Sequence, residues 1–375
     1  MDFDYAPEDT AFRDELRAWL DANLEPGIDH LEWHRRLVAG RWVVPEWPAR
    51  WGGRDATLMQ QVVYQEEMGR ADAPGPRNAI ALYNIGPMLM VHGTPAQQAR
   101  YLPPMVTAEE IWCQGFSEPG AGSDLAALQT RAEDRGDHWA VSGQKVWNTY
   151  GPEADFCLAL CRTNPHVAKH KGISALIIDM HQPGVTARPL RELTGDEGFS
   201  ELFFDGARVP KENVVGPVDA GWQVAMTTLA YERLGTMKLG IQLRQRLAGV
   251  VALARASGRT RDPWTRRQLA ALAIQVELMR LLTLRALTAM LRGEDPGATL
   301  PLGKLQWSYL MQDLAELALK IEGPHGGLYR GSPHEPAGDW AYHCLYARMT
   351  TIGAGTTQVQ KNIIAQRVLG LSRGW

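Results

Sequence analysis

The chain has little of what secreted or membrane proteins need. It contains four cysteines in 375 residues, too few for a disulfide framework, and we expect them to be reduced thiols. No apolar run approaches the roughly 18 residues that a membrane span requires. The N-terminal residues Met1 to Tyr5 are acidic and lack the basic and apolar regions of a signal peptide. We therefore expect a cytoplasmic protein with no membrane partner.

A large excess of one charge sign is also missing, because the formal net charge is −3. Such a balance gives no reason to expect nucleic acid or an anionic membrane as a partner. The hydrophobic content of 45% and the charged content of 22% are those of an ordinary globular protein. A chain of 375 residues is too long for one hydrophobic core and favours two or three domains.

Sequence patterns divide the chain into three zones and predict an α+β multidomain fold. Residues 1–110 predict an all-helical domain, since Phe12, Leu16 and Leu20 follow helical spacing. The segment 42–48 should interrupt these helices as a loop, because its two prolines resist helix formation.

The middle zone, residues 111–218, predicts a small β-barrel or sandwich, because short β-prone runs alternate with glycine and proline. The expected strands lie in five runs: Ile111–Phe116, His138–Val141, Phe156–Cys161, Ile173–Asp179 and Leu202–Phe204.

The last zone, residues 219–375, predicts a four-helix bundle, since its stretches are long and rich in Leu, Ala and Met. The expected helices cover residues 221–256, 264–292, 302–322 and 356–369.

A glycine-rich loop, Gln114 to Asp124, opens the middle zone. Its small residues would let backbone N–H groups approach a ligand closely, and two serines add hydroxyl groups. Composition alone favours an ordinary turn. The order of residues is more informative, and so is a second segment, Ser142 to Thr149, that follows about twenty residues later.

Together these two segments resemble the flavin-binding signatures of the acyl-CoA dehydrogenase family. Further matches lie at residues 171–174, 183–185, 209–210, 213–216 and 363–370, so that the resemblance covers essentially the whole chain. It implies the family's order of helical, β and helical domains and an FAD cofactor. It also implies an acyl-CoA substrate, an electron-transferring flavoprotein as electron acceptor, and a homotetramer.

The resemblance also implies which residues contact FAD. Trp147 would cover one face of the isoalloxazine ring, and the Thr149 hydroxyl would bond its N5 atom. The contacts to the adenine half would include Thr356 and Gln358, whereas the segment 322–327 departs from the family pattern and stays unassigned. The full implied set is Gln114, Phe116, Ser117, Gly122, Ser123, Trp147, Asn148, Thr149, Thr356 and Gln358.

The expected catalytic glutamate near the C-terminus is absent, because Ala354 occupies its place. A minority of the family, including the isovaleryl and long-chain enzymes, carries its base on an earlier helix directly before an arginine. Glu232 and Arg233 match that arrangement, and the residues three and four positions away from Glu232 are uncharged. We therefore predict Glu232 as the base. The implied substrate contacts are Ser123, Arg233, Ala354 and Gly355.

Glu232 would abstract the proton next to the thioester carbonyl while a hydride moves to FAD N5, which yields a trans-2-enoyl-CoA. Two other functions stay open. One is an FAD-binding or non-catalytic subunit of a heteromeric acyl-CoA dehydrogenase, and the other is a flavin-dependent oxygenase of the same superfamily. The acyl group, and whether CoA or a carrier protein holds it, also stays open.

Metal chemistry is not expected. His30 and His34, like His166 and His170, are spaced by four residues, but neither pair has a third ligand at an obvious spacing. Two of the cysteines, Cys157 and Cys161, are expected to pack inside the β domain.

Overall fold

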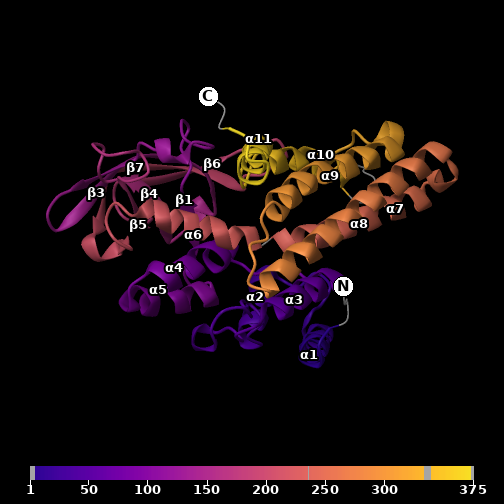
Figure 1. Ribbon diagram of the computed structural model, residues 1–375, viewed down its shortest axis with the longest axis horizontal. Coiled ribbons are helices and arrows are strands. Elements are labelled where there is room, and N and C mark those ends of the chain that lie inside the picture. Colours follow the sequence, from indigo (N-terminus) through magenta and orange to yellow (C-terminus); the bar gives the residue numbers. More distant parts are fainter. Residues whose placement is uncertain (1–4, 235, 333–338, 373–375) are drawn as a thin grey trace. The chain divides into compact units, whose positions relative to one another are not determined.

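The computed structural model describes residues 5–234, 236–332 and 339–372, without the side chains of residues 229–238. Its contacts divide the chain into two units, residues 1–234 and 235–375. Within these ranges the predicted order of a helical part, a sheet and a second helical part is confirmed (Figure 1).

The N-terminal helices begin where the sequence supplies caps. Asp29 accepts hydrogen bonds from the N–H groups of Leu31 and Glu32, and Thr57 forms a capping box with Gln60. Segment 42–48 is a loop, as predicted, and Trp42 and Trp47 bury their rings in the core. The helices are α1 (Pro7–Asn23), α2 (His30–Ala39), α3 (Leu58–Arg70), the π-helix η2 (Ala81–Ile85), α4 (Gly86–His92) and α5 (Pro95–Thr107).

The middle part forms one eight-stranded sheet in the order β6-β7-β3-β2-β4-β5-β8, with β1 paired to β4. The strands are β1 (Trp112–Gly115), β2 (Arg131–Asp134), β3 (His138–Thr149), β4 (Phe156–Arg162), β5 (Ile173–Asp179), β6 (Val185–Leu190), β7 (Phe199–Pro210) and β8 (Val214–Val215).

The sheet is buried on both faces at β4 and β5. Cys157 and Cys161 pack into a core shared with β3 and β7, whereas Leu158 and Leu160 pack against the N-terminal helices. The core that holds Cys157 and Cys161 is shared by strands that are far apart in the sheet order, so the sheet curves around this core. This agrees with the predicted small barrel or sandwich.

The predicted strand bounds were partly wrong. β2 and β6 were not foreseen, since both are short and expose much of their surface. β3 and β7 each extend to 12 residues, well beyond the predicted runs. The missed part of β3 holds Lys145 and Asn148, which are buried polar residues with hydrogen-bond partners rather than loop residues.

Helix α6 (Gly221–Leu234) belongs to the first unit by its contacts, because it packs against β5, η2 and α4. Figure 1 shows it lying between the sheet and α4. The imidazole of His92, at the end of α4, lies 2.7 Å from the Thr227 hydroxyl in α6. The domain boundaries at residues 110 and 218 stay a prediction.

The second unit consists mainly of long helices that share one apolar core, including Leu243, Met279 and Leu314. The predicted stretches 264–292 and 302–322 are confirmed, and 356–369 is helical through Val368. The short helix α10 was not predicted. The helices are α7 (Thr236–Ala256), α8 (Pro263–Leu291), α9 (Thr299–Glu322), α10 (Trp340–Tyr346), α11 (Thr357–Ile363) and the π-helix η9 (Ile364–Val368).

Short 3-10 turns complete the chain. They are η1 (Ala49–Trp51), η3 (Leu125–Ala127), η4 (Gly151–Glu153), η5 (Lys211–Asn213), η6 (Arg259–Arg261), η7 (Gly323–His325) and η8 (Ala347–Thr351). None of the helices in the described ranges is long and apolar enough to cross a membrane.

Candidate functional site

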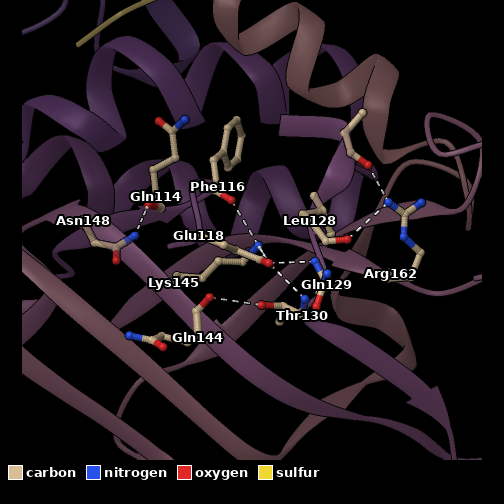
Figure 2. Close-up of polar contacts among 11 residues, drawn as sticks. Gln114, Phe116, Glu118, Leu128, Gln129, Thr130, Gln144, Lys145, Asn148 and Arg162 are labelled. Atoms are coloured by element: carbon tan, nitrogen blue, oxygen red, sulfur yellow. Dashed lines mark hydrogen bonds and ion pairs between the residues drawn. The ribbon is translucent and has the colours of Figure 1, made fainter. Parts of the chain in front are cut away.

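The glycine-rich loop is held by a buried ion pair. The Lys145 ammonium, fully buried in β3, lies 2.8 Å from the Glu118 carboxylate and 3.1 Å from the Phe116 carbonyl oxygen (Figure 2). The same carboxylate accepts hydrogen bonds from the backbone N–H groups of Gln129 and Thr130. One buried glutamate therefore joins the loop, the segment that follows it and β3.

Electrostatics keep this glutamate charged. Burial alone would raise the pKa of the Glu118 carboxyl, but the adjacent Lys145 and the hydrogen bonds from residues 129 and 130 outweigh it and hold that pKa below its usual range. A buried carboxylate that is both paired and hydrogen-bonded fixes the backbone around it. This pair was not predicted from the sequence, although Lys145 lies on the inward side of a strand, which is an unusual place for lysine.

The far side of the loop is presented outward. Gly122 and Ser123 are exposed, and Asp124 forms an ion pair with Lys169 at 2.7 Å. Arg162 donates to the carbonyl oxygens of Ala126 and Leu128, which anchors the segment that follows (Figure 2). Exposed small residues on a fixed backbone suit the close approach of a ligand.

Trp147 lies in a β-bulge and points its indole outward. Its φ is 66°, in the left-handed region, and the pairing of β3 with β7 shifts register between Val146 and Asn148. The side chain is 61% exposed and contacts Phe199 edge-on, with ring centroids 6.0 Å apart. A left-handed backbone at a bulky residue costs roughly 1–3 kcal/mol and is concentrated at functional sites. A flat ligand covering the indole would account for this strained, exposed residue.

Asn148, the next residue, is turned inward and 1% exposed. Its Nδ2 donates to the Gln114 carbonyl oxygen at 2.6 Å, and its own carbonyl oxygen accepts from the Ser200 hydroxyl at 2.8 Å. Its side-chain Oδ1 is buried and has no protein partner within the described part of the chain. Buried acceptors of this kind need a donor, so Asn148 has capacity for a polar ligand.

The structure thus brings together the predicted flavin contacts of the first unit. Gln114, Phe116, Ser117, Asn148 and Thr149 lie on β1, β3 and the loop between them. An isoalloxazine ring has an apolar face and a polar edge. The exposed indole of Trp147 could pack against that face, and the amide of Asn148 could bond that edge, so these residues fit the ring.

The other predicted contacts lie in the second unit. The Thr356 hydroxyl caps α11 by accepting from the N–H of Val359 at 3.1 Å. Ala354 and Gly355, with φ values of 53° and 86°, form an exposed turn just before it, and Gln358 is exposed too. Two successive left-handed residues before a helix N-terminus form a backbone that can present N–H groups to an acceptor.

A buried polar cluster holds the base of this turn. The Ser308 hydroxyl donates to the Thr350 carbonyl oxygen at 2.7 Å, and the buried Lys304 ammonium donates to the same oxygen. The Thr350 hydroxyl donates in return to the Ser308 carbonyl oxygen at 3.1 Å. This anchoring by α9 was not foreseen from sequence, because the partners are 42 residues apart.

The predicted base lies on α6. Glu232 and Arg233 are near its C-terminal end, but their side chains fall outside the described part of the structure. Positions 225, 228 and 232 share one face of an α-helix. Ala225 and Thr228 on that face are 1% and 0% exposed.

The first histidine pair and the cysteine pair have ordinary structural surroundings. His34 is buried with its Nε2 2.9 Å from the Val106 carbonyl oxygen, and His30 makes the same contact with Gly75. Cys157 and Cys161 pack in the sheet core, as predicted, where burial raises the pKa of Cys161 to about 12. Among the residues that the structure describes, no three His, Cys, Asp or Glu side chains gather as a metal site.

Comparisons with known proteins agree along the whole chain. The acyl-CoA dehydrogenase N-terminal, middle and C-terminal domains match residues 6–109, 113–207 and 219–369. Acyl-CoA dehydrogenase IpdE1 of Mycobacterium tuberculosis is 38% identical over 96% of this chain and 97% of its own length.

Two solved structures are also similar over their full length. The Tcur3481-Tcur3483 steroid ACAD has a TM-score of 0.90 at 31% identity, with 100% of each chain covered. The ChsE4-ChsE5 complex from Mycobacterium tuberculosis has a TM-score of 0.86 at 28% identity, again with 100% of each chain covered.

Proposed function

The chain belongs to the acyl-CoA dehydrogenase family of FAD-dependent oxidoreductases, and we propose that it introduces a 2,3-double bond into an acyl thioester with Glu232 as its base. The observation that carries this proposal is the strained, outward-facing Trp147 beside Asn148, on a backbone fixed by the Glu118–Lys145 pair.

FAD, when bound, supplies the acceptor for the hydride that leaves the substrate. Trp147 would cover one face of its ring and exclude water, and Thr149, at the end of β3, would donate a hydrogen bond to its edge. The orphaned Oδ1 of Asn148 would accept from a ring N–H. Thr356 and Gln358 would contact its adenine half.

Glu232 would take the proton from the carbon next to the thioester carbonyl. This needs a carboxylate with a raised pKa in a dry environment. The buried Ala225 and Thr228 on the same helical face support such surroundings. The exposed alternative, a glutamate at position 354, does not exist in this chain.

The charge that develops on the thioester oxygen needs hydrogen-bond donors. The N–H of Ala354 would serve, because alanine keeps the amide that a glutamate would have offered there. The anchoring of Thr350 by Ser308 and Lys304 would hold this amide in place. Ser123, Arg233 and Gly355 would contribute further substrate contacts.

The decisive experiment is Glu232→Gln, which keeps the size of the side chain and removes its basicity. FAD content should stay near that of the parent protein, whereas flavin reduction by a good substrate should slow by at least about 10³-fold, roughly 4 kcal/mol of barrier. Stopped-flow absorbance on an acyl-CoA panel measures both. Glu109→Gln, at an exposed glutamate, is the matched control. A Glu232→Gln protein that is reduced as fast as the parent would show that the base is elsewhere.

A second candidate is a subunit of a heteromeric acyl-CoA dehydrogenase. Two observations favour it: the similar ChsE4-ChsE5 and Tcur3481-Tcur3483 structures each carry two protein names, and Ala354 replaces the usual base. Protein expressed alone would then bind FAD poorly or show no activity until a second family chain is added. An FAD spectrum with turnover by the chain alone would exclude this role.

Partners follow from the same proposal. Electrons would pass to an electron-transferring flavoprotein, and the chain would assemble as a homotetramer. The exposed apolar residues Ile274, Leu278 and Leu281 support assembly, since their spacing places them in one stripe along α8.

A further inference from the structure

Two amide side chains meet between the π-helix η2 and strand β1. The Nδ2 of Asn84 donates to the Oε1 of Gln114 at 3.2 Å, and both side chains are half-buried. Ala81 and Met88, three and four positions from Asn84 on the same helical face, are apolar and fully buried. The pair is therefore a polar spot among apolar neighbours. π-helical turns are rare and often occur at functional sites.

The pair keeps unused hydrogen-bonding capacity. Among the described residues, the Oδ1 of Asn84 and the Nε2 of Gln114 have no further protein partner. Each amide group offers two donors and a carbonyl acceptor, and one bond joins the two side chains. If both amides were turned over, a free donor and a free acceptor would still remain side by side. The result does not depend on how the two groups are assigned.

The main chain of Gln114 cannot supply the missing partner, because its carbonyl oxygen already accepts from Asn148. The side chain of Gln114 projects toward the N-terminal helices, away from Asn148 (Figure 2). Gln114 thus has two separate roles, with its backbone tied to β3 and its amide facing η2.

The position of this pair links it to the reaction. The π-helix η2 packs against β1, which opens the flavin signature, and against α6, which carries Glu232. The contact between His92 and Thr227 ties the following helix, α4, to α6 as well. The pair therefore lies where one element contacts both the start of the flavin signature and the helix that carries Glu232.

We infer that Asn84 and Gln114 recognise a hydroxyl group on the acyl part of the substrate, which deepens the proposed function and rests on it. A hydroxyl accepts one hydrogen bond and donates another, so it matches the donor of Gln114 and the acceptor of Asn84 at once. A plain alkyl chain would strip both amides of water without replacing their bonds, and sites of this kind reject substrates that lack the polar group. The substrate class is therefore a hydroxylated acyl thioester.

The test compares two variants with the full-length parent. Asn84→Leu keeps the volume of the side chain and removes its polarity, and Gln114→Met does the same at the other position. Asn23→Leu makes the same chemical change on α1, where the Asn23 side chain donates to the Trp19 carbonyl oxygen of its own helix. The probes are octanoyl-CoA and 3-cyclohexylpropanoyl-CoA, each with its derivatives hydroxylated beyond the fourth carbon.

The parent should favour at least one hydroxylated probe over its plain counterpart by about 10-fold or more in kcat/KM. Both site variants should reduce this preference to within about 3-fold, mainly through KM, and Asn84→Leu should keep the FAD content of the parent. Calorimetric titration of the matching 2-enoyl products should show the same loss in Kd, independently of turnover. Asn23→Leu should retain the preference.

If the parent shows the same kcat/KM for plain and hydroxylated probes, the inference is wrong and the proposed function is unaffected. The same holds if the Asn84→Leu protein retains the preference or loses activity equally on plain and hydroxylated probes. A parent that is reduced by none of the thioesters and binds none of the products overturns the proposed function, and the inference with it.

Discussion

Replacing Lys145 with methionine should cost the first unit about 3 kcal/mol of folding free energy. Methionine fills most of the same space but leaves the Glu118 carboxylate, 8% exposed, without its counter-ion. Removing one partner of a buried ion pair costs about 3–5 kcal/mol, because a charge stays buried without compensation. The lower figure applies here, since the N–H groups of Gln129 and Thr130 still donate to the carboxylate at 2.7 and 2.8 Å.

The cost of this substitution should shrink in acid. In the parent, the pKa of folded Glu118 lies below its usual value, so the pair stabilises the fold above the unfolded pKa, and this stability is lost as pH falls through the folded pKa. In Lys145→Met, burial acts without the ammonium group and raises that pKa, so protonation relieves the buried charge. The stability difference between the two proteins should be larger at pH 7 than near about pH 5.

Thermal unfolding at both pH values measures the effect. A loss of about 3 kcal/mol corresponds to a Tm lower by roughly 6–12 °C for a unit of this size. The double variant Lys145→Met with Glu118→Gln removes both charges and should recover part of the loss. Lys171→Met, at an exposed lysine, is the matched control. A Tm of Lys145→Met within about 2 °C of the parent at pH 7 would refute the reasoning.

Three further predictions concern the cofactor, the base and the assembly. Trp147→Ala should fold normally, because its indole is exposed, but should weaken FAD binding by at least about 10-fold in fluorescence titration, and unchanged affinity would contradict its proposed contact with the ring. Adding Ala354→Glu to Glu232→Gln should restore part of the lost flavin reduction if position 354 faces the substrate, whereas full retention of the defect would argue that it does not. Light scattering at micromolar concentration should give an oligomer that Ile274→Glu with Leu278→Glu weakens, and a monomeric parent would contradict the proposed homotetramer.

Local patterns were sufficient for most of the fold. Apolar spacing and stretches rich in Leu, Ala and Met identified the long helices, because helical periodicity repeats within a few residues. Continuous apolar runs identified β4 and β5, which are buried on both faces. The same patterns predicted β3 too short, because the polar residues Lys145 and Asn148 interrupt the apolar run. Their partners in other segments, which allow them to be buried in the strand, are not visible in the sequence.

The sequence by itself determined the family, the flavin signature and the absence of a glutamate at position 354, because these depend on the order of neighbouring residues. Only the tertiary structure revealed the Glu118–Lys145 pair, whose members are 27 residues apart, and the Asn84–Gln114 pair, whose members are 30 apart. Both depend on strand register and on how η2 packs against β1. Hydrogen bonds between distant segments form only where folding brings a donor and an acceptor together, and local sequence patterns do not predict which distant residues will be partners.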